Sequence, residues 1–140
     1  MATELKLKLQ EGDQAPDFSA ATNGSGRVSL ADFKGKQVIL YFYPRDDTPG
    51  CTQEACGFRD HFAVFKKRGA VVLGVSVDPV KAHDKFVTKF KLPFPLLADD
   101  DKKIVNDYGV RGQKSFMGRK YEGIHRVTFL IGPDGKIKKI

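Results

Sequence analysis

An unbroken apolar run, V-I-L-Y-F-Y at residues 38–43, ends at Pro44 and gives way to a turn-rich loop that reaches Gly50. Such a run of β-branched and aromatic residues is typical of a central strand that is buried on both faces. Beyond the loop, apolar residues recur at helical spacing, at Ala55, Phe58, Phe62 and Phe65, and predict a helix. Gly69 is in a position to end that helix. This strand–loop–helix unit predicts an α/β protein.

The alternation of strand and helix continues toward the C-terminus. Residues 71–77 form a second apolar run, and Asp78-Pro79 supplies an N-cap followed by a proline at the first helical position. The apolar stripe of that helix consists of Ala82, Phe86, Val87 and Phe90. Residues 94–98 predict a third strand of the sheet, behind Pro93.

The last third of the chain predicts one short helix and a C-terminal hairpin. The helix begins at residues 99–101, ends at Gly109 and turns Ile104, Val105 and Tyr108 inward. Residues 110–123 are Gly-rich and basic, and we expect a long loop there. Residues 127–131 and 136–140 predict two strands joined by the turn G-P-D-G.

The N-terminal part predicts a hairpin in front of the sheet, with strands at residues 18–21 and 27–29 and a turn between them. We expect residues 1–10, where Leu and Lys alternate, to be a solvated arm or an edge strand. The element order is then βαβαβαββ after the hairpin, in a single domain over residues 1–140. It predicts a mixed central sheet flanked by helices, with parallel right-handed crossovers and an antiparallel edge.

Composition and charge exclude several classes of protein. No apolar run approaches the roughly 20 residues of a membrane helix, and the N-terminus has no secretory signal pattern. The chain has two cysteines, so we expect a cytoplasmic protein whose cysteine pair is catalytic or metal-binding rather than structural. The net charge of +7 comes from scattered lysines without a basic block, which predicts neither a nucleic-acid nor a membrane partner.

Cys51 is the first candidate site residue, because it lies where a buried strand has ended and a helix begins. Sites in open α/β sheets gather at the carboxyl ends of strands. Free N–H groups and the helix dipole at a helix N-terminus also stabilise an anion, and thiolate is the reactive form of cysteine. The competing interpretation is an inert cysteine that only fills the core.

Cys56 follows five residues later in the same predicted helix. In an intact helix this spacing separates the two Cα atoms by roughly 8–9 Å, whereas a disulfide needs about 7 Å or less. Either the two cysteines never pair, or the first helical turn must unwind for them to do so. Cys56 could also be a small residue tolerated on the helix flank.

A metal site is the alternative for this segment, because Cys51, Cys56 and His61 form C-x4-C-x4-H. On a helix these side chains advance by about 140° at each step and point in three directions. Structural zinc also needs four ligands at tighter spacing, so we expect neither a metal nor another cofactor. Thr48 by itself is typical of a turn or cap, but its hydroxyl lies within reach of a thiolate at Cys51.

The string F-Y-P-R-D-D-T-P-G-C-T-Q-E-A-C-G-F-R-D at residues 42–60 resembles the active-site region of peroxiredoxins. It is most similar to the bacterioferritin comigratory protein, or peroxiredoxin Q, subfamily. The likeness extends to G-D-Q-A-P-D-F near the N-terminus, G-V-S-V-D at 74–78 and G-I-H-R-V-T-F-L-I-G-P-D-G-K-I from Gly123. The family pattern P-x-x-x-T-x-x-C is met by Pro44, Thr48 and Cys51.

The resemblance implies a thioredoxin-like fold and an atypical 2-Cys peroxiredoxin that reduces hydrogen peroxide and organic hydroperoxides, with a role in antioxidant defence. Cys51 matches the peroxidatic cysteine, Cys56 the resolving cysteine and Arg126 the active-site arginine, while Pro44 would shield the sulfur from water. From the residues alone, Arg126 is a surface charge at the start of a strand. The Cys51–Cys56 disulfide would be recycled by thioredoxin or glutaredoxin.

Members of that subfamily usually continue into a C-terminal helix over one sheet face, and we expect that helix to be missing here, since the last predicted strand reaches Ile140. We expect a monomer. Two other functions compete with the peroxidase. A general thiol–disulfide oxidoreductase would usually carry C-x-x-C, and a basic nucleic-acid or chaperone-like module would rest on the charge of +7 alone.

Overall fold

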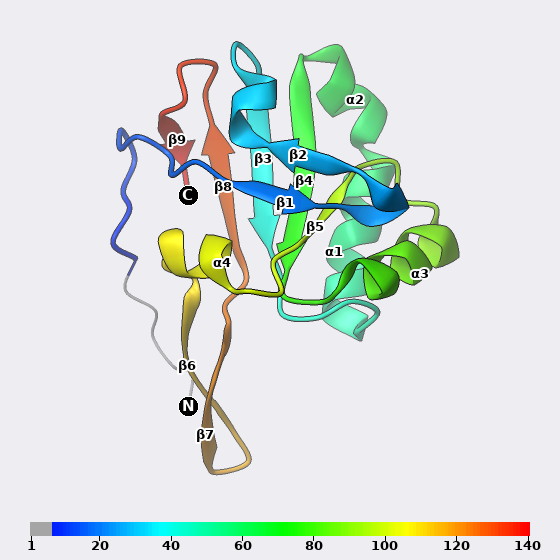
Figure 1. Ribbon diagram of the computed structural model, residues 1–140, viewed down its shortest axis with the longest axis vertical. Helices are drawn as coiled ribbons and strands as arrows, with labels where there is room; N and C mark the ends of the chain where they lie inside the picture. The colour runs from blue at the N-terminus through cyan, green and yellow to red at the C-terminus, as the bar shows by residue number, and fades with distance from the viewer. Residues whose placement is uncertain (1–6) are drawn as a thin grey trace.

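The computed structural model describes residues 7–140 and has a five-stranded sheet of order β5-β4-β3-β8-β9 at its centre (Figure 1). The strands are β3 (Gln37–Phe42), β4 (Ala70–Ser76), β5 (Leu96–Ala98), β8 (Val127–Ile131) and β9 (Ile137–Lys139). Strands β3, β4 and β5 run parallel, whereas β8 is antiparallel to both β3 and β9. The predicted mixed sheet with an antiparallel C-terminal edge is therefore confirmed.

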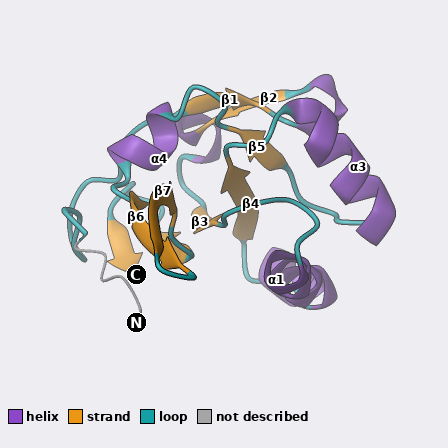
Figure 2. Cartoon of the chain, turned by 90° about the horizontal axis from the view of Figure 1, so that it is seen from below, coloured by secondary structure: helices purple, strands orange, loops and turns teal. Residues whose placement is uncertain are grey.

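Helices and a small hairpin cover the two faces of this sheet. Helix α1 (Pro49–Asp60) and helix α2 (Phe62–Lys67) lie on one side, with α3 (Val80–Phe90) beside β5. The opposite side carries α4 (Lys103–Asp107) and the hairpin β1 (Ser19–Ala21) and β2 (Arg27–Ser29), as Figure 2 shows. Short 3₁₀ helices, η1 (Asn23–Ser25) and η2 (Leu30–Phe33), complete the hairpin region. The predicted N-terminal hairpin is confirmed.

The central strand β3 feeds both apolar layers because successive side chains point to opposite faces. Leu40 and Phe42 pack with Phe129 in the layer under α4 and the hairpin. Tyr41 packs instead in the layer under α1, where it stacks on Phe58 with ring centroids 4.6 Å apart. The run at residues 38–43 is thus buried on both faces, as its composition predicted.

The predicted single helix up to Gly69 is wrong, since α1 ends at Asp60 and α2 begins at Phe62. His61 leaves the helical conformation, with φ −104° and ψ 7°, and its Nδ1 lies 2.9 Å from the carbonyl oxygen of Gly57. The ring thereby competes for a carbonyl that the helix ladder would use. The predicted helix start at Asp78 is also wrong by one residue, because Pro79 is the N-cap of α3.

The predicted loop at residues 110–123 is instead an antiparallel hairpin, β6 (Arg111–Phe116) and β7 (Arg119–Ile124). It extends away from the central sheet in Figure 1. Its two-residue turn has Met117 at φ 51° and Gly118 at φ 79°, the positive values that a tight hairpin turn requires. Methionine seldom adopts such a conformation, so the sequence carries no clear turn signal.

Residues 1–6 of the predicted N-terminal arm lie outside the described residues. From residue 7 onward, Leu7 and Leu9 are partly buried and pack against the layer under α4. Gln14 forms an isolated antiparallel bridge with Lys136. This part of the arm is therefore attached to the body of the protein by apolar contact and is not fully solvated.

Gly74 in the middle of β4 is a position where any side chain would overlap its neighbours. A Cβ atom there would lie 2.7 Å from Cδ2 of Leu96 and 2.8 Å from Cζ of Tyr41, both completely buried. We expect Gly74→Ala to lower the free energy of unfolding by about 1–3 kcal/mol, as overpacked cores do. Urea denaturation measures this change.

Gly57→Ala is the matched control for that substitution. Gly57 lies inside α1 with no atom within 4 Å of an added Cβ. Since alanine is the better helix former, this variant should be as stable as the wild type or more stable by up to about 1 kcal/mol. Equal stability of the wild type and Gly74→Ala would contradict the packing described for β4.

Candidate active site

Cys51 occupies the third position of α1, just beyond the carboxyl end of β3. The loop that follows β3 places Thr48 at the N-cap and Pro49 at the first helical position, where proline's missing N–H is not needed. The thiol is 2% exposed and packs with Tyr41 and Tyr43 in the layer under α1. The thiol is therefore largely shielded from water and lies in the first turn of α1.

Arg126 reaches this sulfur from a segment 75 residues away in the chain. It immediately precedes β8, which runs antiparallel to β3 and pairs Val127 with Phe42. The start of β8 therefore lies beside the carboxyl end of β3, the end of the sheet next to which Cys51 lies. Nη2 of Arg126 donates to Sγ of Cys51 at 3.3 Å.

Glu54 holds the other side of the same guanidinium. Its Oε1 accepts from Nη1 of Arg126 at 2.7 Å, and its carboxylate is only 20% exposed. Glu54 follows Cys51 by three residues, so both side chains lie on one face of α1. Arg126 is thus fixed between two groups of the same helix, and one nitrogen is left pointing at the sulfur.

The charges of this cluster are coupled. Burial alone would lower the pKa of Arg126, but the hydrogen bonds to Cys51 and Glu54 outweigh it and raise that pKa. Burial raises the pKa of Glu54 above its ordinary value, although the bond to Arg126 opposes this change. Burial also raises the pKa of Tyr41 and Tyr43 well above 10.0, so both phenols beside the thiol are neutral.

Thr48 and Pro44 lie in the loop between β3 and α1, and both are partly buried. The hydroxyl of Thr48 donates to the carbonyl oxygen of Arg45 at 3.0 Å. The carbonyl of Thr48 accepts from the backbone N–H of Thr52 at 2.8 Å and so begins the helix. The structure gives Thr48 a partner in Arg45 rather than the direct bond to the thiolate that its spacing suggested.

Cys56 is partly buried on the same helix, and both thiols are free. Since α1 is continuous from Pro49 to Asp60, the two sulfurs cannot bond while the first turns of the helix are intact. Across residues 7–140, no three His, Cys, Asp or Glu side chains come together as a metal site. In the same residues, no helix has both the length and the apolar character needed to cross a bilayer.

Three groups around the site escaped the sequence analysis. Glu54 could have been found from its three-residue spacing to Cys51 on a helix. Lys114, on β6, has its pKa lowered by burial and by the nearby charge of Arg126, but it lies in the segment predicted as a loop. Asp46 and His83 bond to each other over 37 residues, and no spacing rule connects them.

A family model described as AhpC/TSA matches residues 11–140. The chain is 48% identical over 132 residues to Peroxiredoxin Bcp of Escherichia coli strain K12, which covers 94% of this chain and 85% of that protein. It is 44% identical over 133 residues to Peroxiredoxin Bcp of Bacillus subtilis strain 168, covering 95% of this chain and 85% of the relative.

Solved structures give the same result. A cysteine-to-serine mutant of Xylella fastidiosa PrxQ superposes with a TM-score of 0.89 at 36% identity, covering 94% of this chain and 84% of that one. A cysteine-to-serine mutant of Xanthomonas campestris peroxiredoxin Q has a TM-score of 0.85 at 36% identity, with coverage of 95% and 85%. The predicted thioredoxin-like fold is therefore confirmed.

Proposed function

Because this chain belongs to the AhpC/TSA family and, within it, to the peroxiredoxins of the bacterioferritin comigratory protein type, we propose that it reduces hydroperoxides with Cys51 as the nucleophile. The observation that supports this most is the contact of 3.3 Å between Nη2 of Arg126 and Sγ of Cys51. This contact holds the permanent positive charge of Arg126 against a sulfur at a helix N-terminus. The positive charge and the helix N-terminus both favour the thiolate form of Cys51.

In the first step the Cys51 thiolate attacks the proximal oxygen of ROOH. A sulfur–oxygen bond forms, the oxygen–oxygen bond breaks, and the leaving RO⁻ takes a proton to become ROH. Cys51 is oxidised by two electrons to a sulfenic acid, and the peroxide is reduced. Negative charge moves from sulfur to the leaving oxygen during this step, so donors near both atoms stabilise the transition state.

We assign the stabilisation of this negative charge to two hydrogen-bond donors, the guanidinium of Arg126 and the backbone N–H of Cys51. The N–H lies in the first turn of α1, where no helical carbonyl precedes it. Thr48 has a complementary role, because its hydroxyl hydrogen is engaged by the carbonyl of Arg45 and its oxygen is left to accept the proton of the peroxide. Pro44, in the wall of the same loop, limits the access of water.

Cys56 resolves the sulfenic acid. Its thiolate attacks Sγ of Cys51, the sulfenic oxygen leaves as water, and an intramolecular disulfide forms. This step requires the first turns of α1 to unwind, since the intact helix separates the two residues. An external dithiol of the thioredoxin or glutaredoxin type then restores both thiols by exchange. We propose that the protein works as a monomer in the cytoplasm, in antioxidant defence.

A general thiol–disulfide oxidoreductase is the weaker alternative. Such an enzyme keeps both sulfurs within reach of each other on an intact helix. Here the two cysteines are five residues apart in a continuous α1.

Cys56→Ser separates the two chemical steps. We expect one equivalent of hydroperoxide to oxidise Cys51 at a rate within about threefold of the wild type, because the attacking group is intact. The sulfenic acid should then persist, and steady-state turnover with thioredoxin should fall by at least about tenfold. Quenched-flow alkylation with intact-protein mass spectrometry measures both. Full turnover in Cys56→Ser would contradict the resolving role of Cys56.

A further inference from the structure

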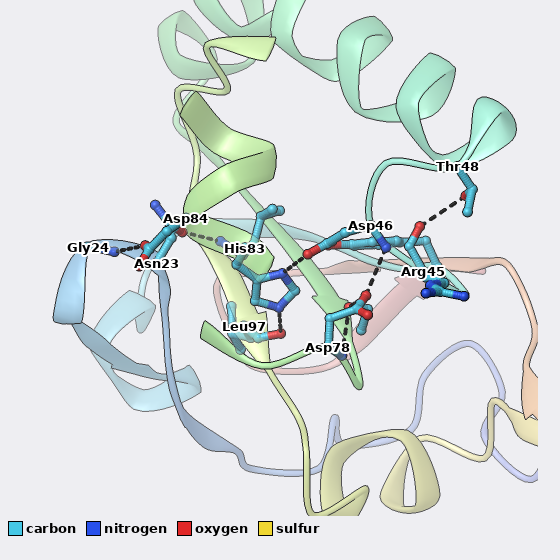
Figure 3. A network of polar contacts seen from close by, with 12 residues as sticks. Asn23, Gly24, Arg45, Asp46, Thr48, Asp78, His83, Asp84 and Leu97 are labelled. Carbon is cyan, nitrogen blue, oxygen red and sulfur yellow. Dashed lines mark hydrogen bonds and ion pairs between the residues drawn. The ribbon is translucent and has the colours of Figure 1, made fainter. Parts of the chain in front are cut away.

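A buried pair of side chains, Asp46 and His83, joins the loop before α1 to helix α3. Nδ1 of His83 lies 2.6 Å from Oδ2 of Asp46, and the two side chains are 0% and 6% exposed. The other ring nitrogen, Nε2, lies 2.9 Å from the carbonyl oxygen of Leu97 on β5. Figure 3 shows the ring held between these two oxygens.

The protons of this contact can be counted. The carbonyl of Leu97 only accepts, so Nε2 of His83 must carry a hydrogen. The contact between Nδ1 and Asp46 then needs a second proton, which sits on the ring or on the carboxylate. In either case the bond is shielded from water, and removing one partner leaves the facing polar atom of the other buried without that bond.

The second carboxylate oxygen of Asp46 and its backbone N–H are also hydrogen-bonded. Its Oδ1 accepts from the hydroxyl of Tyr43 at 2.5 Å, and its backbone N–H donates to Oδ2 of Asp78 at 2.8 Å. That same Oδ2 also accepts from the hydroxyl of Ser76 at 2.7 Å. Asp46 is therefore fixed at once to Tyr43, to the loop after β4 and to α3, and Figure 3 shows its bonds to Asp78 and His83.

This anchored residue lies two positions before the N-cap of α1. Thr48 bonds back to Arg45 through its hydroxyl and begins the helix through its carbonyl. Unwinding that spreads from Cys51 toward the N-terminus therefore reaches Asp46 after a few residues. To continue, it must separate Asp46 from His83 and leave a buried group without its partner.

We propose that Asp46 and His83 are positioning residues for Cys51, because their bond sets how readily the first turn of α1 unwinds for disulfide formation. The proposal rests on the function assigned above to Cys51 and Cys56. Neither residue touches the sulfur. Their bond favours the folded site that reacts with peroxide and slows the attack of Cys56 on the sulfenic acid.

The test measures the two steps separately after one equivalent of hydrogen peroxide, by alkylation and intact mass. In His83→Leu and in Asp46→Ala, disulfide formation should be about tenfold faster. The folded loop no longer provides the remaining side chain with its partner, so unwinding the first turn of α1 costs less free energy. Oxidation of Cys51 should stay within about twofold of the wild type, since most molecules remain folded before they react. A general loss of stability would not separate the two rates in this way.

Two further variants keep the result interpretable. In the double variant Asp46→Ala, His83→Leu the same single bond is lost, so its disulfide step should be faster than the wild type by about the same factor as in the single variants and not by the product of the two factors. Asp84→Ala is the control on the same helix, since it removes a 2.7 Å hydrogen bond from the backbone N–H of Gly24 and not the bond to the loop. Both rates should be unchanged there.

Wild-type disulfide rates in both single variants would overturn the proposal and would show that unwinding stops before residue 46. The same result would leave Cys51 as the peroxidatic residue. A wild type that does not consume peroxide would instead refute the proposed function itself, so the two failures are distinguishable.

Discussion

Replacing Cys51 by serine should lower the rate of hydroperoxide reduction by at least about a thousandfold. A serine hydroxyl at the same place is hardly ionised at neutral pH, and the alkoxide is the only form that could attack the peroxide oxygen as the thiolate does. The helix N-terminus and Arg126 would remain, but they stabilise charge on a nucleophile that the variant lacks. Peroxide consumption in the presence of excess dithiol measures the loss.

Cys51→Ser differs from the wild type by one atom and should keep its fold, because the side chain stays within a small buried site that is 2% exposed. Thermal unfolding checks this point. Cys56→Ser is the control for the loss of a cysteine as such, since it retains the first oxidation. Should Cys51→Ser retain more than about a tenth of the wild-type rate, the proposed nucleophile would be wrong.

Arg126→Met should slow the oxidation of Cys51 by about a hundredfold to a thousandfold, as the loss of one donor aimed at developing charge does in other enzymes. The variant removes the hydrogen bond to Sγ of Cys51 and leaves the rest of α1 unchanged. Stopped-flow measurement with hydrogen peroxide gives the second-order rate. Arg126→Lys keeps the charge but not the two-sided bond between Glu54 and the sulfur, so it should recover only part of the rate.

In Arg126→Met, the partly buried carboxylate of Glu54 would lose its partner, and this loss could itself alter the site. The double variant Arg126→Met, Glu54→Gln removes that problem and should be as slow as Arg126→Met. Arg119→Met is the matched control on the exposed side of the neighbouring hairpin and should react at the wild-type rate. Equal rates for Arg126→Met and Arg119→Met would contradict the role of Arg126.

The sequence predicts most of the sheet, because the signals that define it are local. Val38 to Tyr43 is long and apolar enough to be recognised as a central strand, and the G-P-D-G turn fixes the last hairpin. The break at His61 and the hairpin at Met117-Gly118 escaped prediction for a common reason. Each depends on one residue whose backbone conformation its residue type does not announce, namely His61 with φ −104° and ψ 7° and Met117 with φ 51°.

The site divides along a similar line. Cys51 and Cys56 could be chosen as candidates from local pattern, and their spacing predicted that they pair only if the first helical turn unwinds. Only the family resemblance singled out Arg126, because residue pattern alone does not show that the antiparallel pairing of β8 with β3 brings its side chain against Cys51. The pair of Asp46 and His83 was also out of reach, because a contact between a loop and a helix 37 residues later leaves no periodic signal.

The separation of Arg126 from Cys51 in the chain has a consequence for the protein during its synthesis. A ribosome releases the N-terminal part first, at about 5–20 residues per second, so the thiol emerges several seconds before the guanidinium that is 75 residues further on. Until β8 pairs with β3, we expect the nascent chain to carry an ordinary cysteine that reacts slowly with peroxide. On the role proposed for Arg126, we therefore expect reactivity to begin only when the sheet is complete, so that the unfinished polypeptide is spared from oxidation.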